Sequence, residues 1–152
     1  MRRRILITQL AIPLGVGGLS ALVTREGMKK FAGLNQPPLS PPGWLFPVVW
    51  TLLFAAMGYA AYLMHISGKR QARHALRIYT LQLIFNFGWS VIFFNLGWYL
   101  VAFLWLIALW ILILVTALRF SRINKTAGWL LAPYLAWVAF AGYLNLGVYL
   151  LN

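Results

Sequence analysis

Four long stretches of the chain carry no charged residue, and short polar segments separate them. The stretches run from Ile5 to Val23, from Trp44 to Met64, from Ile78 to Leu118 and from Thr126 to Asn152. A helix needs about 20 apolar residues to cross the hydrocarbon layer of a bilayer, so the first, second and fourth stretches each predict one crossing. The third is about twice that length. The segment from Asn95 to Trp98 divides it, because Asn and Gly favour a turn and Trp suits the membrane interface.

This pattern predicts an all-α integral membrane protein, a bundle of five transmembrane helices in one domain over residues 1–152. The composition agrees, since 62% of the residues are hydrophobic and 9% are charged. The basic N-terminus resembles a secretory signal, but no small-x-small cleavage motif follows it, so we expect the first helix to be retained. The expected helices cover approximately residues 5–24, 41–65, 75–94, 99–119 and 126–151.

The charge distribution predicts the orientation in the membrane. The formal net charge is +12, which in a soluble protein would suggest nucleic acid. Here the basic residues stand at the ends of the expected spans, so no nucleic-acid binding is expected. With the N-terminus inside, the inner side collects ten basic residues and the outer side three. This asymmetry predicts a cytoplasmic N-terminus. The inner residues are Arg2, Arg3, Arg4, Lys69, Arg70, Arg73, Arg77, Arg119, Arg122 and Lys125, and the outer ones are Arg25, Lys29 and Lys30.

A proline-rich segment connects the first two expected spans. Five of the seven prolines lie between Asn35 and Trp50. Each proline removes a backbone donor and disfavours helical angles in the preceding residue, so residues 36–42 are predicted to be extended and rigid. Ser40 and Pro41 suit the N-cap and first turn of the second helix. A rigid segment at the membrane surface can close over a cavity, and its expected lid residues are Pro37, Pro38, Pro41 and Pro42.

Polar side chains inside the third expected span follow helical spacing. Gln82, Asn86 and Ser90 recur every four residues, which places them on one face of the helix. Polar groups are costly within a bilayer, so they generally have a purpose. Two interpretations are open. The side chains hydrogen-bond neighbouring helices, or they line an interior cavity.

The cavity interpretation also involves the second and fifth expected spans. Trp137, Ala141 and Asn145 share one face of the fifth span. The small side chain of Ala141 would leave space for a ligand on that face. The residues expected to line this cavity are Trp50, Phe54, Asn86 and Trp137.

The eight tryptophans divide by their position along the spans. Trp44, Trp98 and Trp129 lie near span ends and are expected to be interfacial anchors. Trp105 and Trp110, on an almost wholly apolar span, are expected to face lipid. Three tryptophans that lie inside spans are candidates for stacking against a flat aromatic ligand: Trp50, Trp89 and Trp137.

Several kinds of chemistry are not supported by the sequence. The absence of cysteine excludes disulfides and thiolate metal sites. No carboxylate lies within a span, which argues against a proton-coupled pump. His65 and His74 flank the second loop and could ligate a haem iron, but isolated interfacial histidines are common. We expect no metal site and no resident cofactor.

Three ordered motifs resemble the tryptophan-rich sensory protein/translocator protein family (TspO, or peripheral-type benzodiazepine receptor). They are Pro-Pro-Leu-Ser-Pro-Pro-Gly-Trp with a following Pro-Val-Val-Trp within residues 37–50, Ile-Phe-Asn-Phe-Gly-Trp-Ser at 84–90, and Pro-Tyr-Leu-Ala-Trp-Val-Ala-Phe-Ala at 133–141. The resemblance covers essentially the whole chain. It implies a five-helix, homodimeric protein, and the bacterial cell membrane is the expected location.

The resemblance also implies ligands and the residues that bind them. Members of this family bind porphyrins and haem-type tetrapyrroles, sterols, and synthetic isoquinoline or benzodiazepine ligands in a cavity closed by the first loop. The matching positions here are Trp50, Asn86, Trp137 and Ala141, with Asn145 one turn beyond.

Two departures from the family pattern bear on the ligand. Lys30 and Phe31 stand where many bacterial relatives have Trp-Tyr, so Phe31 joins the expected lid without an indole or a hydroxyl. The sterol motif requires Lys or Arg after its tyrosine, but Tyr149 is followed by Leu150, Leu151 and Asn152. This departure weakens the case for sterol binding.

Three functions are compatible with the sequence. The first is a membrane protein that binds tetrapyrroles in sensing, transport or scavenging. The second is an enzyme for light- and oxygen-dependent porphyrin degradation, with Trp50 and Trp137 as its catalytic residues. The third is a structural membrane protein whose cavity holds lipid.

Overall fold

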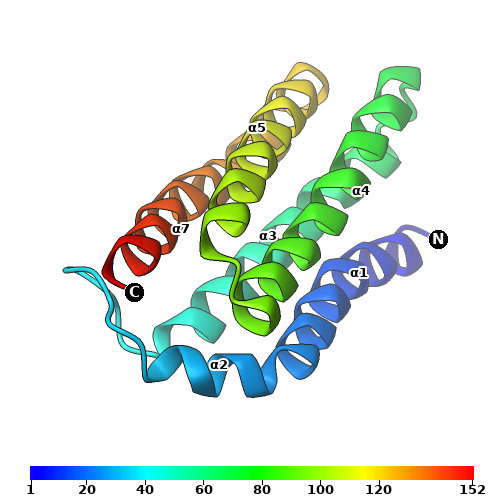
Figure 1. Ribbon diagram of the computed structural model, residues 1–152. Coiled ribbons are helices and arrows are strands. Elements are labelled where there is room, and N and C mark those ends of the chain that lie inside the picture. The colour runs from blue at the N-terminus through cyan, green and yellow to red at the C-terminus, as the bar shows by residue number, and fades with distance from the viewer.

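The computed structural model describes residues 1–152 and consists of helices joined by short connections, without strands. Five helical units are long and apolar enough to cross a membrane, and they pack side by side as a bundle (Figure 1). The predicted all-α fold with five spans is therefore confirmed. The units are α1 (Arg2–Val23), α3 (Leu45–Ile66), α4 (Arg70–Ser90) with the π-helical turn η1 (Val91–Leu96), α5 (Tyr99–Ile123), and α6 (Lys125–Leu130) followed by α7 (Ala132–Leu151).

The helices form a closed ring. α1 packs against α3, α3 against α6, α7 against α5, and α5 against α4, which returns to α1. Glycine permits a close approach between α1 and α3, since a Cβ on Gly58 would lie 2.5 Å from the carbonyl oxygen of Gln9. Small residues allow such approaches between membrane helices. The α1–α3 pair is therefore set by backbone contact as well as by side chains.

Local sequence signals explain two of the positions at which a helix is interrupted. η1 ends at Leu96 and is followed by Gly97, whose φ of 66° is a left-handed conformation that glycine adopts without steric cost. This confirms the predicted division of the third apolar stretch. The last span is interrupted at Leu131, two residues before Pro133, whose ring removes a backbone donor. Asn124 begins the preceding α6, because its side chain accepts hydrogen bonds from the backbone N–H groups of Thr126 and Ala127.

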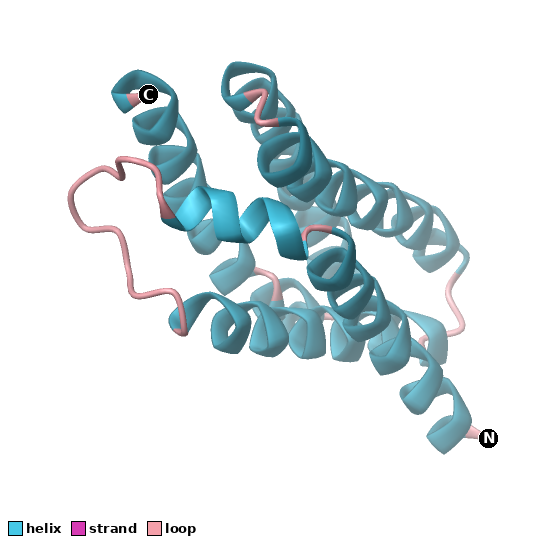
Figure 2. Ribbon diagram, turned by 60° about the horizontal axis from the view of Figure 1, so that its bottom comes forward, coloured by secondary structure: helices cyan, strands magenta, loops and turns pink.

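The connection between the first two spans is partly helical. An additional helix, α2 (Arg25–Ala32), lies across one end of the bundle (Figure 2). Gly27 allows this helix to lie close to η1, since a Cβ there would collide with the carbonyl oxygen of Phe94. On the exposed side, Lys29 Nζ pairs with Glu26 at 3.4 Å.

The prediction that the second spanning helix begins at Pro41 is wrong. α3 begins at Leu45, whose N–H donates to the carbonyl of Pro42 at 3.0 Å. Pro42 disfavours helical angles at Pro41, so the helix cannot start there. The Ser40 hydroxyl does not cap a helix and instead donates to the carbonyl of Pro37 at 2.6 Å. We call the resulting non-helical segment, residues 33–44, the strap.

The prediction that Trp105 and Trp110 face lipid is also wrong. Both side chains are half-buried, and each indole N–H donates to a backbone carbonyl on a neighbouring helix. The Trp105 N–H reaches the carbonyl of Phe85 at 2.8 Å, and the Trp110 N–H reaches that of Leu135 at 3.0 Å. An indole donor exposed to hydrocarbon would lack a partner, which costs free energy. These two tryptophans therefore tie α5 to α4 and α7.

Candidate ligand-binding site

A buried chain of hydrogen bonds crosses the bundle between α4 and α7. The hydroxyl of Tyr134 donates to Gln82 Oε1 at 2.7 Å, and Asn86 Nδ2 donates to the same hydroxyl at 2.7 Å. The next polar residue on this face of α4, Ser90, pairs through its hydroxyl with the hydroxyl of Ser20 on α1. The four-residue spacing thus identified a face that points into the bundle. Its side chains join helices, as the first interpretation of these polar residues expected.

Aromatic rings from α3 and α7 gather beside this polar chain. Trp50 stacks on Phe54 at a centroid distance of 5.5 Å, and it meets Tyr134 at 6.2 Å and Trp137 at 6.5 Å in edge-to-face geometry. Edge-to-face and offset-stacked pairs at these distances are the favourable arrangements of aromatic rings. We call these four residues the Trp50–Trp137 cluster. Through Tyr134 it also contacts Asn86, so the structure brings Trp50, Phe54, Asn86 and Trp137 together.

The cluster contains one buried polar atom without a partner. Trp137 Nε1 is buried and makes no hydrogen bond. Leaving a buried donor unsatisfied costs about 1–3 kcal/mol. An acceptor on a molecule placed between α3 and α7 would remove that cost. The Trp50 and Trp137 rings meet edge to face, however, so a ligand that lies between them requires the rings to part.

Trp89 and Asn145 lie in a separate arrangement. The indole N–H of Trp89 donates to Asn145 Oδ1 at 3.0 Å, and Asn145 Nδ2 donates to the carbonyl of Tyr99 at 2.8 Å. Both ends of the Asn145 amide are therefore satisfied within the protein. Ala141 is buried one turn from Trp137 and one turn from Asn145, and so separates the two arrangements along α7.

Phe31 lies over the second arrangement. Its ring is 5.4 Å from that of Phe93 and 5.5 Å from that of Phe94, while Trp89 stacks on Phe93 at 5.3 Å. The side chain that the sequence assigned to the lid thus fixes α2 onto η1. It contacts the Trp89 side of the bundle.

The strap is fastened to the second half of α7, and in Figure 1 its loop lies beside the C-terminus. Pro37 is buried against Gly147, and a Cβ on Gly147 would lie 2.5 Å from the Pro37 ring. Next to it, the Tyr143 hydroxyl donates to the carbonyl of Pro38 at 2.6 Å. Pro41 is half-buried and Pro42 exposed, and they carry the chain from these contacts to α3.

Tyr134, Tyr143 and Gly147 were not expected from the sequence to take part in the site. Tyr134 stands three residues before Trp137 and seven before Ala141, which is the spacing of one helix face. That signal was present in the sequence. No local pattern marks Tyr143 and Gly147, because their partners in the strap lie about a hundred residues earlier in the chain.

These features define a membrane-spanning five-helix bundle with tryptophans in its interior and a proline-rich strap at one end. The chain belongs to the TspO/MBR family, whose model matches residues 9–151. It is 38% identical to the Tryptophan-rich protein TspO of Chlorobaculum tepidum, over 100% of this chain and 99% of that protein. It is also 38% identical to the Translocator protein of Bos taurus, over 85% and 79% of the two chains. Identity to the Tryptophan-rich sensory protein of Cereibacter sphaeroides is 34%, over 80% and 76%. The family resemblance is confirmed.

Proposed function

We propose that this protein binds porphyrins and haem-type tetrapyrroles between α3, α4 and α7, and serves in tetrapyrrole sensing, transport or scavenging. The observation that carries the proposal is the unpartnered N–H of Trp137 within an aromatic cluster. A flat aromatic ligand with acceptor atoms at its edge matches both features. Synthetic isoquinoline or benzodiazepine ligands share this chemistry. The names of two relatives, Translocator protein and Tryptophan-rich sensory protein, agree with a role in transport or sensing.

In the proposed complex, the indoles of Trp50 and Trp137 part and flank the macrocycle. Each aromatic contact contributes on the order of 1 kcal/mol beyond burial of apolar area. The Trp137 N–H and the Asn86 amide bind polar atoms at the edge of the ligand. Ala141 leaves room for the macrocycle, Phe54 supplies more of the wall, and the pair of Trp89 and Asn145 beyond Ala141 borders the far end of the proposed site.

A second candidate function is light-dependent oxidation of a bound porphyrin with molecular oxygen as the oxidant. The observation that favours it is the direct contact between Trp50 and Trp137, because both indoles would lie against the macrocycle and are themselves oxidisable. In that case these two side chains would be catalytic. Binding is required for both functions, whereas a new porphyrin product is required only for the second.

Titration of protoporphyrin into the purified protein in lipid nanodiscs tests both proposals. We expect Trp137→Phe to weaken binding several-fold, since it removes the donor and part of the stacking surface. Ala141→Leu should abolish binding because the added atoms fill the proposed space. Ala136→Leu, on an exposed face of the same helix, is the matched control and should bind as the wild type does.

Two results would contradict these proposals. Full binding by Ala141→Leu would place the ligand elsewhere in the protein. Unchanged product formation by Trp137→Phe under light would exclude a catalytic role for that indole. Absorbance spectra recorded on the same samples, in the dark and after illumination, distinguish loss of binding from loss of degradation.

We also propose a cytoplasmic N-terminus in a bacterial cell membrane. The support is the excess of basic residues at one end of the bundle, from Arg2 to Arg4, at the start of α4 and at the end of α5. The only ion pair in the structure, between Lys29 and Glu26, lies at the opposite end, so none of these basic residues is neutralised by a carboxylate. Basic residues retained on one side set the orientation of membrane proteins.

A homodimer is proposed as the assembled form. Gly17 and Gly88 both pack within one chain, since a Cβ at Gly17 would lie 2.6 Å from the Phe54 ring and one at Gly88 would lie 2.9 Å from the Trp105 ring. Gly15 and Gly18 of α1 have open space around them instead. Eleven per cent of the most apolar stretch of α1 is buried, whereas the other spans bury about a third or more. This small-residue face of α1 is therefore the proposed contact between copies.

A further inference from the structure

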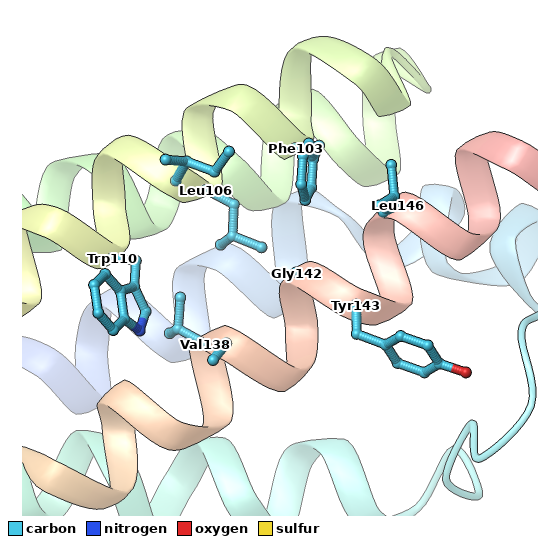
Figure 3. Close-up of a pocket in the computed structure, with 9 residues that line it drawn as sticks. Phe103, Leu106, Trp110, Val138, Gly142, Tyr143 and Leu146 are labelled. Carbon is cyan, nitrogen blue, oxygen red and sulfur yellow. The ribbon is translucent and has the colours of Figure 1, made fainter.

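A groove of about 420 Å³ runs between α5 and α7 on the outside of the bundle (Figure 3). Eight of the nine residues that line it are hydrophobic. Its walls include Phe103, Leu106 and Trp110 of α5, and Gly142, Tyr143 and Leu146 of α7. The Trp50–Trp137 cluster faces α3, so the groove lies on a different side of α7 from the proposed tetrapyrrole site.

Gly142 gives the groove its depth. A Cβ at this position would lie 3.9 Å from Leu106 Cδ2 and 3.9 Å from Phe103 Cε2, which is ordinary van der Waals contact. At Gly88, by comparison, a Cβ would lie 2.9 Å from the ring of Trp105. Glycine is therefore not needed at position 142 for α5 and α7 to approach each other. Its effect is to leave unfilled space between them.

The polar atoms that line the groove are already engaged. The N–H of Trp110 donates to the carbonyl of Leu135, and the hydroxyl of Tyr143 points away from the groove toward the strap, where it donates to Pro38 (Figure 3). The groove therefore presents hydrocarbon and ring surfaces to its occupant. A charged or strongly polar occupant would lose its hydration there without gaining partners.

We propose that the groove binds one acyl chain of a membrane phospholipid. Both of its walls are membrane-spanning helices, so the medium in contact with it is the hydrocarbon of the bilayer. The side chains that line an unfilled groove would lack van der Waals partners along its whole length, and a flexible acyl chain would supply those contacts. The Tyr143 end of the groove lies beside the strap, at the end of the bundle where a headgroup reaches the membrane surface.

A second copy of this chain fits the groove less well. Helices associate in membranes through small residues that let their backbones approach. The rims of this groove carry Phe103, Trp110, Tyr143 and Leu146, which would hold a neighbouring helix away from Gly142. A single chain of methylene groups can reach the floor between these side chains.

Photolabelling tests the proposal directly. The protein is placed in nanodiscs of phosphatidylcholine that carries a diazirine in one acyl chain, irradiated, digested and analysed by mass spectrometry. We expect labels on Phe103 and Leu146 to exceed those on Leu104 and Leu118, which are exposed side chains of α5, by several-fold. Gly142→Leu should reduce groove labelling to the level of the exposed side chains. Ala136→Leu, on another face of α7, should leave it unchanged.

Two outcomes would overturn the proposal. Equal labelling of the groove and of the exposed side chains in the wild type would mean that only ordinary surrounding lipid is present. Absence of groove labelling, together with disulfide-linked dimers of Leu146→Cys, would mean that a second copy covers the groove. If Gly142→Leu fails to fold, the distribution of labels between the groove and the exposed side chains of the wild type still distinguishes these outcomes. None of these measurements depends on tetrapyrrole binding.

Discussion

The side-chain amide of Asn152 pairs with the backbone of Asn35, 117 positions earlier in the chain. Asn152 Oδ1 accepts from the Asn35 N–H at 3.2 Å, and Asn152 Nδ2 donates to the Asn35 carbonyl at 2.8 Å. Together with the contacts of Tyr143 and Gly147, this pair fixes the strap to α7. The helix that holds the strap is also the helix that carries Trp137. Movement of α7 would therefore reach both the strap and the proposed site.

Loss of the Tyr143 hydroxyl should loosen the strap. Tyr143→Phe removes the hydrogen bond to Pro38. Since such a bond contributes a net free energy of about 1 kcal/mol, its loss should make the population in which the strap is detached from α7 roughly five-fold larger. We expect hydrogen exchange at Ser40, whose N–H donates to the carbonyl of Pro37, to accelerate by about that factor. Tyr149→Phe is the matched control, because Tyr149 is an exposed tyrosine of the same helix and its hydroxyl makes no hydrogen bond within the chain. Equal exchange in both variants would mean that the hydroxyl does not hold the strap.

Removing the Tyr134 hydroxyl should destabilise the bundle. Tyr134→Phe leaves the Gln82 oxygen and the Asn86 amide without their buried partner. The expected loss is about 1–2 kcal/mol in the free energy of unfolding, measured by titration with denaturing detergent. Tyr62→Phe, a half-buried tyrosine of α3, should change the free energy little. A stability of Tyr134→Phe equal to the wild type would mean that the polar chain adds nothing to the fold.

Two glycines of α1 should respond differently to substitution by leucine. Gly17→Leu should lower the free energy of unfolding, since its side chain would collide with the Phe54 ring. Gly15→Leu has space for its side chain and should leave the monomer stable while reducing crosslinked dimer. Undiminished dimer in Gly15→Leu would move the interface away from this face of α1.

The positions of the basic residues predict the outcome of a topology experiment. A reporter fused after Asn152 should be active outside the cytoplasm, because five spans carry the chain from a cytoplasmic N-terminus to the other side. A second fusion placed after Gly68, between α3 and α4, should report the cytoplasm. Reversal of both signals would show that the charge asymmetry does not set the orientation of this protein.

The spans and the inner face of α4 were predictable because they depend on local pattern. The length of an apolar run reports a crossing, and four-residue spacing placed Gln82, Asn86 and Ser90 on one buried face. The division near Gly97 followed from the same kind of signal. Each of these inferences uses residues that are close together in the sequence.

The remaining features depend on partners far away in the chain or on competing local preferences. Hydropathy could not show where the Trp105 indole points, since that side chain has both an apolar body and a donor that needs a carbonyl. The pairing of Asn35 with Asn152 leaves no trace in either segment. At the start of α3, the N-cap preference of Ser40 was outweighed by the restriction that Pro42 places on Pro41.

Photo-oxidation of tryptophan is the most direct test of where porphyrin binds in this protein. Illuminated protoporphyrin generates reactive oxygen that attacks indoles in contact with it. We expect peptide mass spectrometry to find oxidation first at Trp50 and Trp137, and we expect Ala141→Leu to suppress it. The exposed Trp44 and Trp129 serve as internal controls for unbound porphyrin. Oxidation of those two tryptophans with Trp50 and Trp137 intact would contradict the proposed site.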